Sequence, residues 1–360
     1  MKKLFLFALF AALCCSCTES GTDENTDPNG GSNSGQTTPP DPDSDAKDVI
    51  HVPKGGMLAG ILNELGLKSP SSLKLSGTLG VSDFTTLRNI QSLEHLDISR
   101  VNLSVLPTEA FLECTNIKSV ILPNTLTAIG TQAFWGSSLV SISIPASVEE
   151  IRGSAFFGCS SLKTVTFEKG LQLKTIENST FEDCTALTSI EIPASVEMIG
   201  QYAFNDCTSL HTVTFEKGSQ LKTVDGFSRC TSLTTIEIPA SVEKIGEFAF
   251  YICTSLQTVT FEKGSKLKTI SNGAFAFCWA LTTVDMSACT QVTVIGEYAF
   301  SDDSKLQLFK IGTRTPPSCG NDVFTGINSY SVLKVPAGCV DAYKNATGWK
   351  EFTTISELDE

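Results

Sequence analysis

Cysteine recurs at one fixed position along this chain, three residues after a phenylalanine. Thiols spaced in this way could bind a metal, join as disulfides or pack as a buried column. Stacked repeats would bring their Cα atoms close to disulfide range, but side chains at one repeat position point inward in parallel. Free cysteine packs as a small apolar group, and Ser137 and Asp303 each replace it once, so the pattern favours buried free thiols. The seven positions are Cys114, Cys159, Cys184, Cys207, Cys230, Cys253 and Cys278.

Three further cysteines, Cys289, Cys319 and Cys339, lie outside this column. A Cys319–Cys339 bridge near the C-terminus is an open alternative to two free thiols. After residue 17 the chain has no Cys-x-x-Cys followed by a second pair of cysteines or histidines, the pattern that structural zinc sites use. We therefore predict no metal site and no cofactor.

Residues that could act as catalysts do not assemble into a recognisable set. The histidines His51, His95 and His211 are scattered, and the chain has no His-Glu-x-x-His, Gly-x-Ser-x-Gly or P-loop motif. Glu191 and Glu237 share one strand position two repeats apart, which places them about 10 Å from each other. That separation is beyond the carboxylate spacing of inverting glycosidases. We expect a solvated sheet face there and a protein that is not an enzyme.

An internal repeat must position all of these residues. IPASVEMIG at 192–200 returns as IPASVEKIG at 238–246, and a phenylalanine recurs every 22–25 residues. Each unit reads as a short strand, a turn and a helix-like turn with Ala-Phe. Because such a unit is too small to bury its own core, neighbours must stack into a solenoid. The phenylalanines are Phe111, Phe134, Phe156, Phe181, Phe204, Phe227, Phe250, Phe275 and Phe300.

The predicted fold class is an α/β-type repeat solenoid of about nine 22–25-residue units, with a parallel sheet on one face. Each buried large side chain should contribute ~1.5–3 kcal/mol. Pro193 and Pro239 end their strands, because proline cannot donate to a ladder. Alternate units leave their strands through Glu-Lys-Gly instead, so the duplicated unit is a pair.

The outward positions of the predicted strands are mostly Ser and Thr, interrupted by Glu191, Glu237 and Asp285. These residues alternate with buried Ile and Val, as on a half-buried sheet. Threonine suits strands and keeps a sheet soluble, which is the simpler interpretation. A broad polar platform for a protein or a glycan is the alternative.

Sequence divergence among the repeats is concentrated in the two residues that follow each core phenylalanine. Aromatic side chains there, and one close by, predict a binding surface, because aromatic residues are enriched in binding hot spots. Packing between turns along the convex edge is the alternative. The candidates are Trp135, Phe157, Tyr251, Phe277 and Trp279.

The N-terminus has the features of an export signal. Two lysines precede an unbroken apolar run at 4–13, which is too short to span a bilayer. The run ends at cysteines before the chain turns polar, which resembles the lipobox of bacterial lipoproteins. Cys17 is the expected lipidation site, with Cys15 as the alternative, and residues 1–17 are the predicted lipoprotein signal peptide. An ordinary secretory signal is the other interpretation.

Residues 18–48 are predicted to be a disordered tether, rich in acidic residues, Gly, Ser and Pro. They contain no large apolar side chain, so they cannot offset the entropy cost of ordering. The net charge of the chain is −13 at pH 7. This charge argues against a nucleic-acid partner, because phosphate binding needs clustered Lys and Arg. Membrane contact is expected only through the lipid anchor.

The motif Ala-Phe-x-x-Cys-x-x-Leu-x-x-Ile-x-Ile-Pro resembles the BspA-like leucine-rich repeat of surface lipoproteins from Bacteroides-type bacteria. The resemblance covers about 110–326. The segments 49–109 and 327–360 are similar to the N-terminal and C-terminal caps of such arrays, which shield the exposed ends of a solenoid. The chain is therefore expected to be a capped leucine-rich repeat array.

This family resemblance implies a non-enzymatic, adhesin-like binding protein that uses an extended solenoid surface. The implied partners are a host matrix protein, a bacterial surface protein or a glycan, and we expect a monomer. The implied location is the outer membrane, lipid-anchored and facing the cell surface. The alternative function is a carbohydrate-capture lipoprotein of a polysaccharide uptake system.

Overall fold

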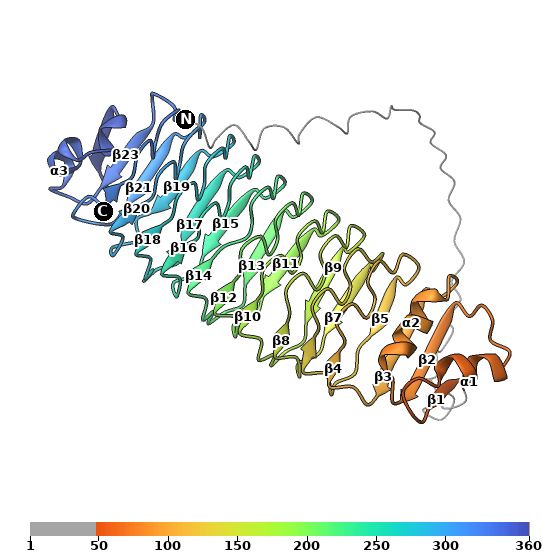
Figure 1. Ribbon diagram of the computed structural model, residues 1–360. Coiled ribbons are helices and arrows are strands. Elements are labelled where there is room, and N and C mark those ends of the chain that lie inside the picture. The colour runs from red at the N-terminus through yellow and green to blue at the C-terminus, as the bar shows by residue number, and fades with distance from the viewer. Residues whose placement is uncertain (1–47, 360) are drawn as a thin grey trace, which may run out of the picture. The chain divides into compact units, whose positions relative to one another are not determined.

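The computed structural model describes residues 48–359, which form a solenoid of stacked turns (Figure 1). Each repeat contributes a four-residue strand, a bend, a two-residue strand and a wider turn that carries Ala-Phe. The predicted signal peptide 1–17, its Cys17 and residues 18–47 of the predicted tether lie outside the described residues.

The longer strands follow one face of the solenoid and are parallel, as predicted. Apolar residues point inward at alternate positions, so that Ile190 and Ile192 are buried while Ser189 and Glu191 are exposed. Regular pairing runs through three stretches, from β1 to β9, from β11 to β13 and from β15 to β24. The strands are β1 (Val49–Val52), β2 (Ser72–Gly77), β3 (His95–Val101), β5 (Ser119–Ile121), β7 (Ser141–Ile144), β9 (Thr164–Phe167), β11 (Ser189–Ile192), β13 (Thr212–Phe215), β15 (Thr235–Ile238), β17 (Thr258–Phe261), β19 (Thr283–Met286), β21 (Leu308–Ile311), β23 (Val332–Val335) and β24 (Thr354–Glu357).

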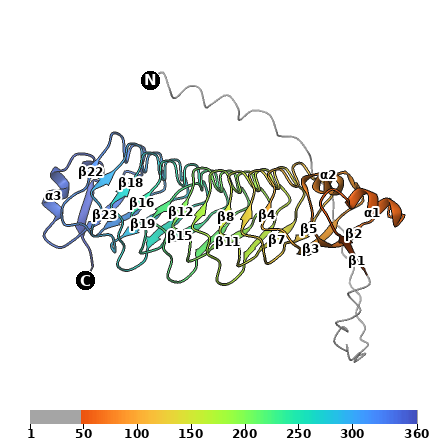
Figure 2. The same ribbon diagram turned by 60° about the horizontal axis from the view of Figure 1, so that its bottom comes forward.

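A second parallel sheet of 10 short strands runs beside the first, and the sequence analysis did not predict it (Figure 2). It forms because the segment after each bend is briefly extended, and it buries an apolar residue such as Ile199 while Met198 stays exposed. The strands are β4 (Val105–Leu106), β6 (Ala128–Ile129), β8 (Glu150–Ile151), β10 (Thr175–Ile176), β12 (Met198–Ile199), β14 (Thr223–Val224), β16 (Lys244–Ile245), β18 (Thr269–Ile270), β20 (Val294–Ile295) and β22 (Ser318–Cys319).

The alternation of the two bend sequences has a structural cause. The glutamate of a Glu-Lys-Gly bend accepts a hydrogen bond from the alanine N–H of the Pro-Ala-Ser bend in the preceding turn. The Ala194 N–H donates to Glu216 at 2.9 Å, and the Ala240 N–H donates to Glu262 at 2.9 Å. A Pro-Ala-Ser bend therefore depends on a Glu-Lys-Gly bend in the next turn to accept its alanine N–H. This dependence explains why the sequence repeats in pairs of turns.

The core phenylalanines form a continuous ladder through the interior. Successive rings from Phe111 to Phe324 stack at centroid distances of 4.9 to 5.7 Å, with interplanar angles of 3° to 16°. Phe324 extends the nine predicted positions by one turn. The rings are fully buried, and offset stacking adds to the free energy of burial.

The cysteine column is buried beside this ladder, as predicted, and the thiols are free. Six of the seven thiols donate to the carbonyl of the core phenylalanine in the preceding turn, as Cys207 does to Phe181 at 3.1 Å, whereas Cys114 donates to Asn116 Oδ1 at 3.5 Å. Cysteine therefore suits this position because it is small and apolar and also gives a buried carbonyl a weak donor. Cys319 and Cys339 are free thiols as well.

Asp303 replaces cysteine at the last position of the column and is fully buried. Its Oδ1 accepts the Cys278 N–H at 2.9 Å, whereas its Oδ2 has no partner among the described residues. Burial raises the pKa of the Asp303 carboxyl well above its ordinary value, and the neighbouring Asp302 adds to the shift. Burial therefore favours the protonated, uncharged form of this carboxyl.

The N-terminal segment replaces the first Ala-Phe turns with helices α1 (Leu58–Glu64) and α2 (Val81–Asn89). The buried Asp83 carboxylate joins them, because it accepts the N–H groups of Gly56, Leu58 and Gly80 at 2.6, 3.0 and 2.8 Å. These are unpaired donors at helix starts, where a carboxylate is favourable. Phe84 of α2 packs edge-on against Phe111 and so begins the ring ladder.

The C-terminal segment closes the ladder with α3 (Val340–Asn345) and the 3-10 helix η3 (Trp349–Glu351). Trp349 is fully buried and packs against Phe309 and Phe324 at centroid distances of 5.9 and 5.3 Å. Its indole N–H donates to the Pro317 carbonyl at 3.0 Å. The last core rings are therefore covered by an aromatic cluster.

Candidate functional site

The wider turns that carry Ala-Phe line up along one edge of the solenoid, which we call the turn face. Backbone N–H groups of one turn donate to carbonyls of the next, as Phe204 does to Gly226 and Phe227 does to Ala249, both at 2.8 Å. Equivalent positions of successive turns are therefore neighbours. The turns are 107–114, 130–137, 152–159, 177–184, 200–207, 225–230, 246–253, 271–278, 296–303 and 320–326.

The predicted aromatic residues fall into separate sets on this face. Trp135 and Phe157 stack on each other from adjacent turns, with a centroid distance of 4.2 Å and an interplanar angle of 26°. Both are half-buried, so this pair packs between turns, in agreement with the alternative interpretation. Trp279 is 50% exposed and follows the turn that contains Phe277.

The second set, which we call the aromatic group, consists of Phe248, Tyr251 and Phe277. Tyr251 packs edge-on against Phe248 at 5.4 Å and against Phe277 at 5.6 Å. Phe248 is 44% exposed, and its ring lies over Gly273, where an added Cβ would come within 2.4 Å of the ring. Phe248 was not among the predicted residues. Two other turns place an exposed aromatic residue at the same position, Tyr202 and Tyr298, but neither has a ring contact like that of Phe248 with Tyr251 among the described residues.

The aromatic group is held on strained backbone. Phe248 and Phe277 have φ values of 56° and 62°, in the left-handed region. This conformation costs L-residues roughly 1–2 kcal/mol. Gly273 occupies the position equivalent to Phe248 in one other turn, where glycine has no such cost, but most turns place a non-glycine residue there, such as Gln132 or Tyr202. The left-handed conformation therefore belongs to the repeat as a whole.

The turn face is strongly acidic. Its turns contain no lysine, and their only cations are Arg152 and Arg229. Lysines lie elsewhere, where several form ion pairs with a neighbouring turn, such as Lys174 with Glu197 at 2.9 Å. The exposed or half-buried carboxylates of the turn face are Glu109, Glu113, Glu177, Glu182, Asp183, Asp206, Asp225, Glu247, Glu297, Asp302 and Asp322.

Three of these carboxyls have raised pKa values. Burial raises the pKa of Asp225 to about 6, and the nearby Glu247 adds to the shift, while the Gly226 N–H and Lys244 oppose it. Burial also raises the pKa of Asp183, with repulsion from Asp206 and Glu182. The pKa of Asp206 is raised by burial and opposed by Arg229, 3.9 Å away. Partial burial that the neighbouring cations and N–H groups do not fully offset is therefore the main cause of these raised pKa values.

The long-strand face is different in character. Its outward residues are exposed Ser and Thr in the first repeats and become half-buried toward β19. Glu191 lies opposite Thr214, and Glu237 lies opposite Thr260. No aromatic residue occupies the outward positions between β7 and β19. The two glutamates therefore belong to a solvated sheet surface, as expected.

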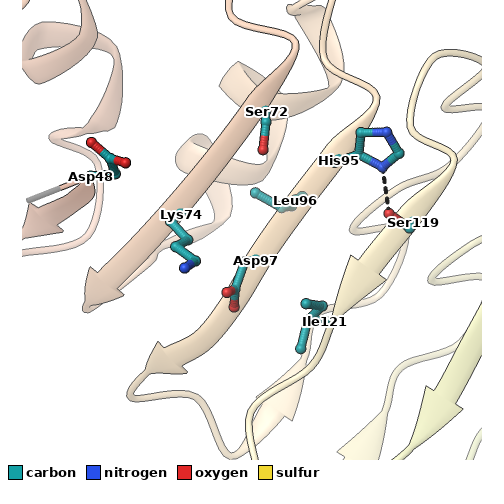
Figure 3. Close-up of a pocket in the computed structure, with 8 residues that line it drawn as sticks. All are labelled: Asp48, Ser72, Lys74, His95, Leu96, Asp97, Ser119 and Ile121. Carbon is teal, nitrogen blue, oxygen red and sulfur yellow. Dashed lines mark hydrogen bonds between the residues drawn. The ribbon is translucent and has the colours of Figure 1, made fainter. Parts of the chain in front are cut away.

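A hollow of about 450 Å³ lies on this face at the N-terminal end, across β2, β3 and β5 (Figure 3). The sequence analysis missed it, because it treated this segment only as a cap. The hollow combines an ammonium group, two carboxylates, an imidazole, two hydroxyls and an exposed isoleucine. These residues are Asp48, Ser72, Lys74, His95, Leu96, Asp97, Ser119 and Ile121.

The His95–Ser119 pair in this hollow resembles a base beside a nucleophile. His95 Nδ1 lies 2.8 Å from Ser119 Oγ (Figure 3). A catalytic base is normally oriented by a third group, and Asp97 is engaged instead by the Ser99 N–H at 2.9 Å. Among the described residues, the His95–Ser119 pair thus lacks a hydrogen bond from Asp97 that would complete a triad.

Comparison with known families agrees with the repeat pattern. A profile described as the BspA type leucine rich repeat region, in 6 copies, matches residues 83–211, 174–307 and 222–347. The chain belongs to the BspA-type leucine-rich repeat family. The family resemblance inferred from the sequence motif is therefore confirmed, and so is the repeat solenoid.

Solved structures similar to this BspA-type chain are leucine-rich repeat proteins. A protein from Bacteroides ovatus is 23% identical, with 81% of this chain and 82% of that chain covered and a TM-score of 0.47. The pneumococcal vaccine antigen PcpA is 19% identical, with 81% and 80% covered and a TM-score of 0.42. A leucine rich cell surface protein from Faecalibacterium prausnitzii is 23% identical, with 60% and 72% covered and a TM-score of 0.36. None of the curated proteins searched matches the chain.

In the part of this BspA-type chain that the structure describes, no group of three His, Cys, Asp or Glu side chains is arranged to hold a metal ion. Between residues 48 and 359, no helix is both long and apolar enough to cross a membrane.

Proposed function

We propose that this protein is a non-enzymatic, adhesin-like binding protein, and that it recognises a macromolecule through the turn face. The observation that carries the proposal is the aromatic group, in which Phe248 is 44% exposed and contacts Tyr251, and Tyr251 in turn contacts Phe277. Aromatic side chains dominate the binding energy of many interfaces.

The candidates for other roles are weaker. The hollow around His95 has one base-nucleophile pair without an orienting partner in hydrogen-bond contact. The long-strand face offers Ser and Thr but no aromatic anchor between β7 and β19. Membership of the BspA-type family supports binding through an extended solenoid surface.

For the location, we propose acylation at Cys17, which would anchor the mature chain in the outer membrane with the repeats outside the cell. This part of the proposal rests on the N-terminal sequence, in which an apolar run ends at cysteines before a polar segment. A tether rich in Gly, Ser and Pro would hold the solenoid away from the membrane.

Protease treatment of intact cells tests the location. Release of the repeat body into the medium is expected, because exposed tethers are cut readily. Protection until the outer membrane is broken would overturn surface display and leave a periplasmic role. A variant with Cys17→Ala should lose the membrane fraction, and retention of membrane binding would point to Cys15.

A binding panel tests the function. The full chain should bind a protein ligand among immobilised host matrix and bacterial surface proteins. Binding confined to plant or host glycans would favour the alternative, a carbohydrate-capture lipoprotein of a polysaccharide uptake system. Binding that is unchanged in a Phe248→Gly, Phe277→Gly double variant would show that the turn face is not the surface used.

A further inference from the structure

We propose that the turn face between residues 177 and 278 binds a basic, partly apolar segment of a partner protein. This inference rests on the proposed function and specifies the partner. Apolar side chains of the segment pack on the aromatic group, and its Lys or Arg groups pair with carboxylates of the preceding turns. The argument combines the accessible rings with the distribution of charge around them.

The aromatic group supplies the apolar contact. Phe248 is 44% exposed, and Tyr251 and Phe277 are half-buried beside it. Because the rings pack edge-on, they differ in orientation and can contact an apolar side chain from different sides. Arg and Lys stems can also lie on such rings through their methylenes and their charge.

The carboxylates N-terminal to the aromatic group supply the polar contact. Asp225 lies in the turn before Phe248 and accepts a hydrogen bond from the Gly226 N–H at 2.7 Å. Among the ion pairs of residues 48–359, none includes Asp225. Asp206 has Arg229 at 3.9 Å, a separation at the outer limit of an ion pair. Positive groups of a partner would therefore meet carboxylates that this chain leaves poorly compensated.

Electrostatic repulsion between these carboxylates strengthens the argument. Burial raises the pKa of the Asp183 carboxyl, and repulsion from Asp206 and Glu182 raises it further, whereas Arg229 lowers it. Asp225 faces Glu247 and Lys244, and its pKa is about 6. A bound cation favours the ionised form, so binding would lower these pKa values and release protons. Affinity should accordingly be full above pH 6 and should decrease as the pH falls through that value.

The dimensions fit an extended chain. Asp183, Asp206, Asp225, Phe248 and Phe277 belong to five successive turns. Turns that are about 4.8 Å apart place the first and last of these residues about 20 Å from each other. An extended segment rises about 3.3 Å per residue, so about six residues cover the distance. An acidic partner, such as a sulfated glycan or a nucleic acid, would be repelled.

The test uses the purified full chain and defined octapeptides. The probe alternates Arg and Leu, a second peptide alternates Glu and Leu, and a neutral cello-oligosaccharide represents glycans. Calorimetric titration should show binding of the Arg-Leu peptide only, with affinity that falls at least about tenfold between low and high salt, because the contact is charged.

Variants separate recognition from folding. Phe248→Gly with Phe277→Gly should weaken peptide binding about tenfold, as the loss of aromatic anchors does, while relief of strain keeps or raises the melting temperature. Asp225→Asn should weaken binding about threefold and reduce its dependence on pH. The controls are Gln132→Gly, at the position of Phe248 in an early turn, and Asp322→Asn, beyond the reach of the segment. Both should bind like the unchanged chain.

The outcomes distinguish the two proposals. Binding of the cello-oligosaccharide or the acidic peptide, without binding of the basic peptide, would overturn the basic partner but leave a binding protein. Equal binding of the basic peptide by the glycine double variant would show that charge alone attracts it and would overturn the docking site. Failure to bind any probe here and any member of the macromolecule panel would overturn both proposals.

Discussion

The interior and the turn face of this solenoid use the same turns in opposite ways. Inside, one position holds Phe in every repeat from 111 to 324, and another holds Cys in seven repeats. The two residues between this Phe and this Cys differ from turn to turn. They are Trp-Gly at 135–136, Glu-Asp at 182–183 and Tyr-Ile at 251–252. Within one turn, the interior positions thus keep the same residue type in almost every repeat, whereas the adjacent turn-face positions change from repeat to repeat.

The difference follows from what each position touches. An interior side chain contacts its own copies above and below, so a change in one turn leaves a cavity or a clash in three. A turn-face side chain is only partly buried, so it can vary from turn to turn at a lower cost than an interior one. Regions that vary without affecting stability are where a repeat protein can acquire a ligand.

The largest expected effect comes from breaking the ladder in its middle. Phe227→Ala should lower the free energy of unfolding by ~3–5 kcal/mol, because the cavity lies between two stacked rings. Tyr251→Ala, on the turn face, should cost less than ~1.5 kcal/mol, because the ring is only half-buried. Urea unfolding followed by circular dichroism measures both. Equal losses of unfolding free energy in the two variants would contradict the proposed difference between the interior and the turn face.

Asp303 is the exception in the interior, and its replacement sharpens the comparison. Asp303→Cys restores the column residue and should raise the free energy of unfolding by ~1–3 kcal/mol near pH 8, because a partnerless buried oxygen is removed. The folded pKa lies above the ordinary 3.8, so the unchanged chain loses stability as the pH rises above about 4. The gain should therefore shrink near pH 4. A gain that does not depend on pH would contradict a neutral buried acid.

Backbone strain on the turn face provides the third prediction. Ile252 has a φ of 59°, a conformation in which a β-branched residue is an outlier. Ile252→Gly should raise the free energy of unfolding by ~1 kcal/mol, as measured by thermal unfolding. Thr254→Gly, two residues further on and outside the left-handed region, should lower it by ~0.5–1 kcal/mol. A loss in both variants would mean that the Ile252 position carries no strain.

The smallest expected effect concerns Asp225. Its folded pKa of about 6 lies above the ordinary 3.8, so its ionisation opposes folding as the pH rises through this interval. Asp225→Asn should therefore add ~1 kcal/mol at pH 7.5, a value discounted because the side chain is partly solvated. It should add nothing at pH 4. Thermal unfolding of both chains at pH 7.5 and at pH 4 provides the measurement. A larger gain in stability at pH 4 than at pH 7.5 would contradict a raised pKa for Asp225 in the folded protein.

The sequence was a reliable guide to the interior because the interior repeats. Recurrent Phe, Cys, Leu and Ile report contacts between copies, and the core phenylalanines and column cysteines named from the pattern are buried. The second sheet was missed because its strands have two residues each, too few for an alternation of apolar and polar residues to register.

The candidate site could be predicted only in part. Tyr251 and Phe277 were identified because they diverge between repeats, but Phe248 joins them through the fold of its own turn. The stacking of Trp135 on Phe157 depends on how adjacent turns align, which the spacing alone does not give. The hollow at His95 combines residues of β2 and β3 in the N-terminal cap with residues of β5 in the first repeat, where the repeat pattern is weakest.

Hydroxyl-radical footprinting of the full chain tests the central claim most directly, because it maps which face a ligand covers. With the Arg-Leu octapeptide bound, the account predicts protection of Phe248, Tyr251 and Phe277. His95 in β3 and His211 just before β13, which lie outside the aromatic group, should react as in the free protein. Protection of His95 or His211 with unchanged reactivity of the aromatic group would contradict the account and move the binding site to the strand face.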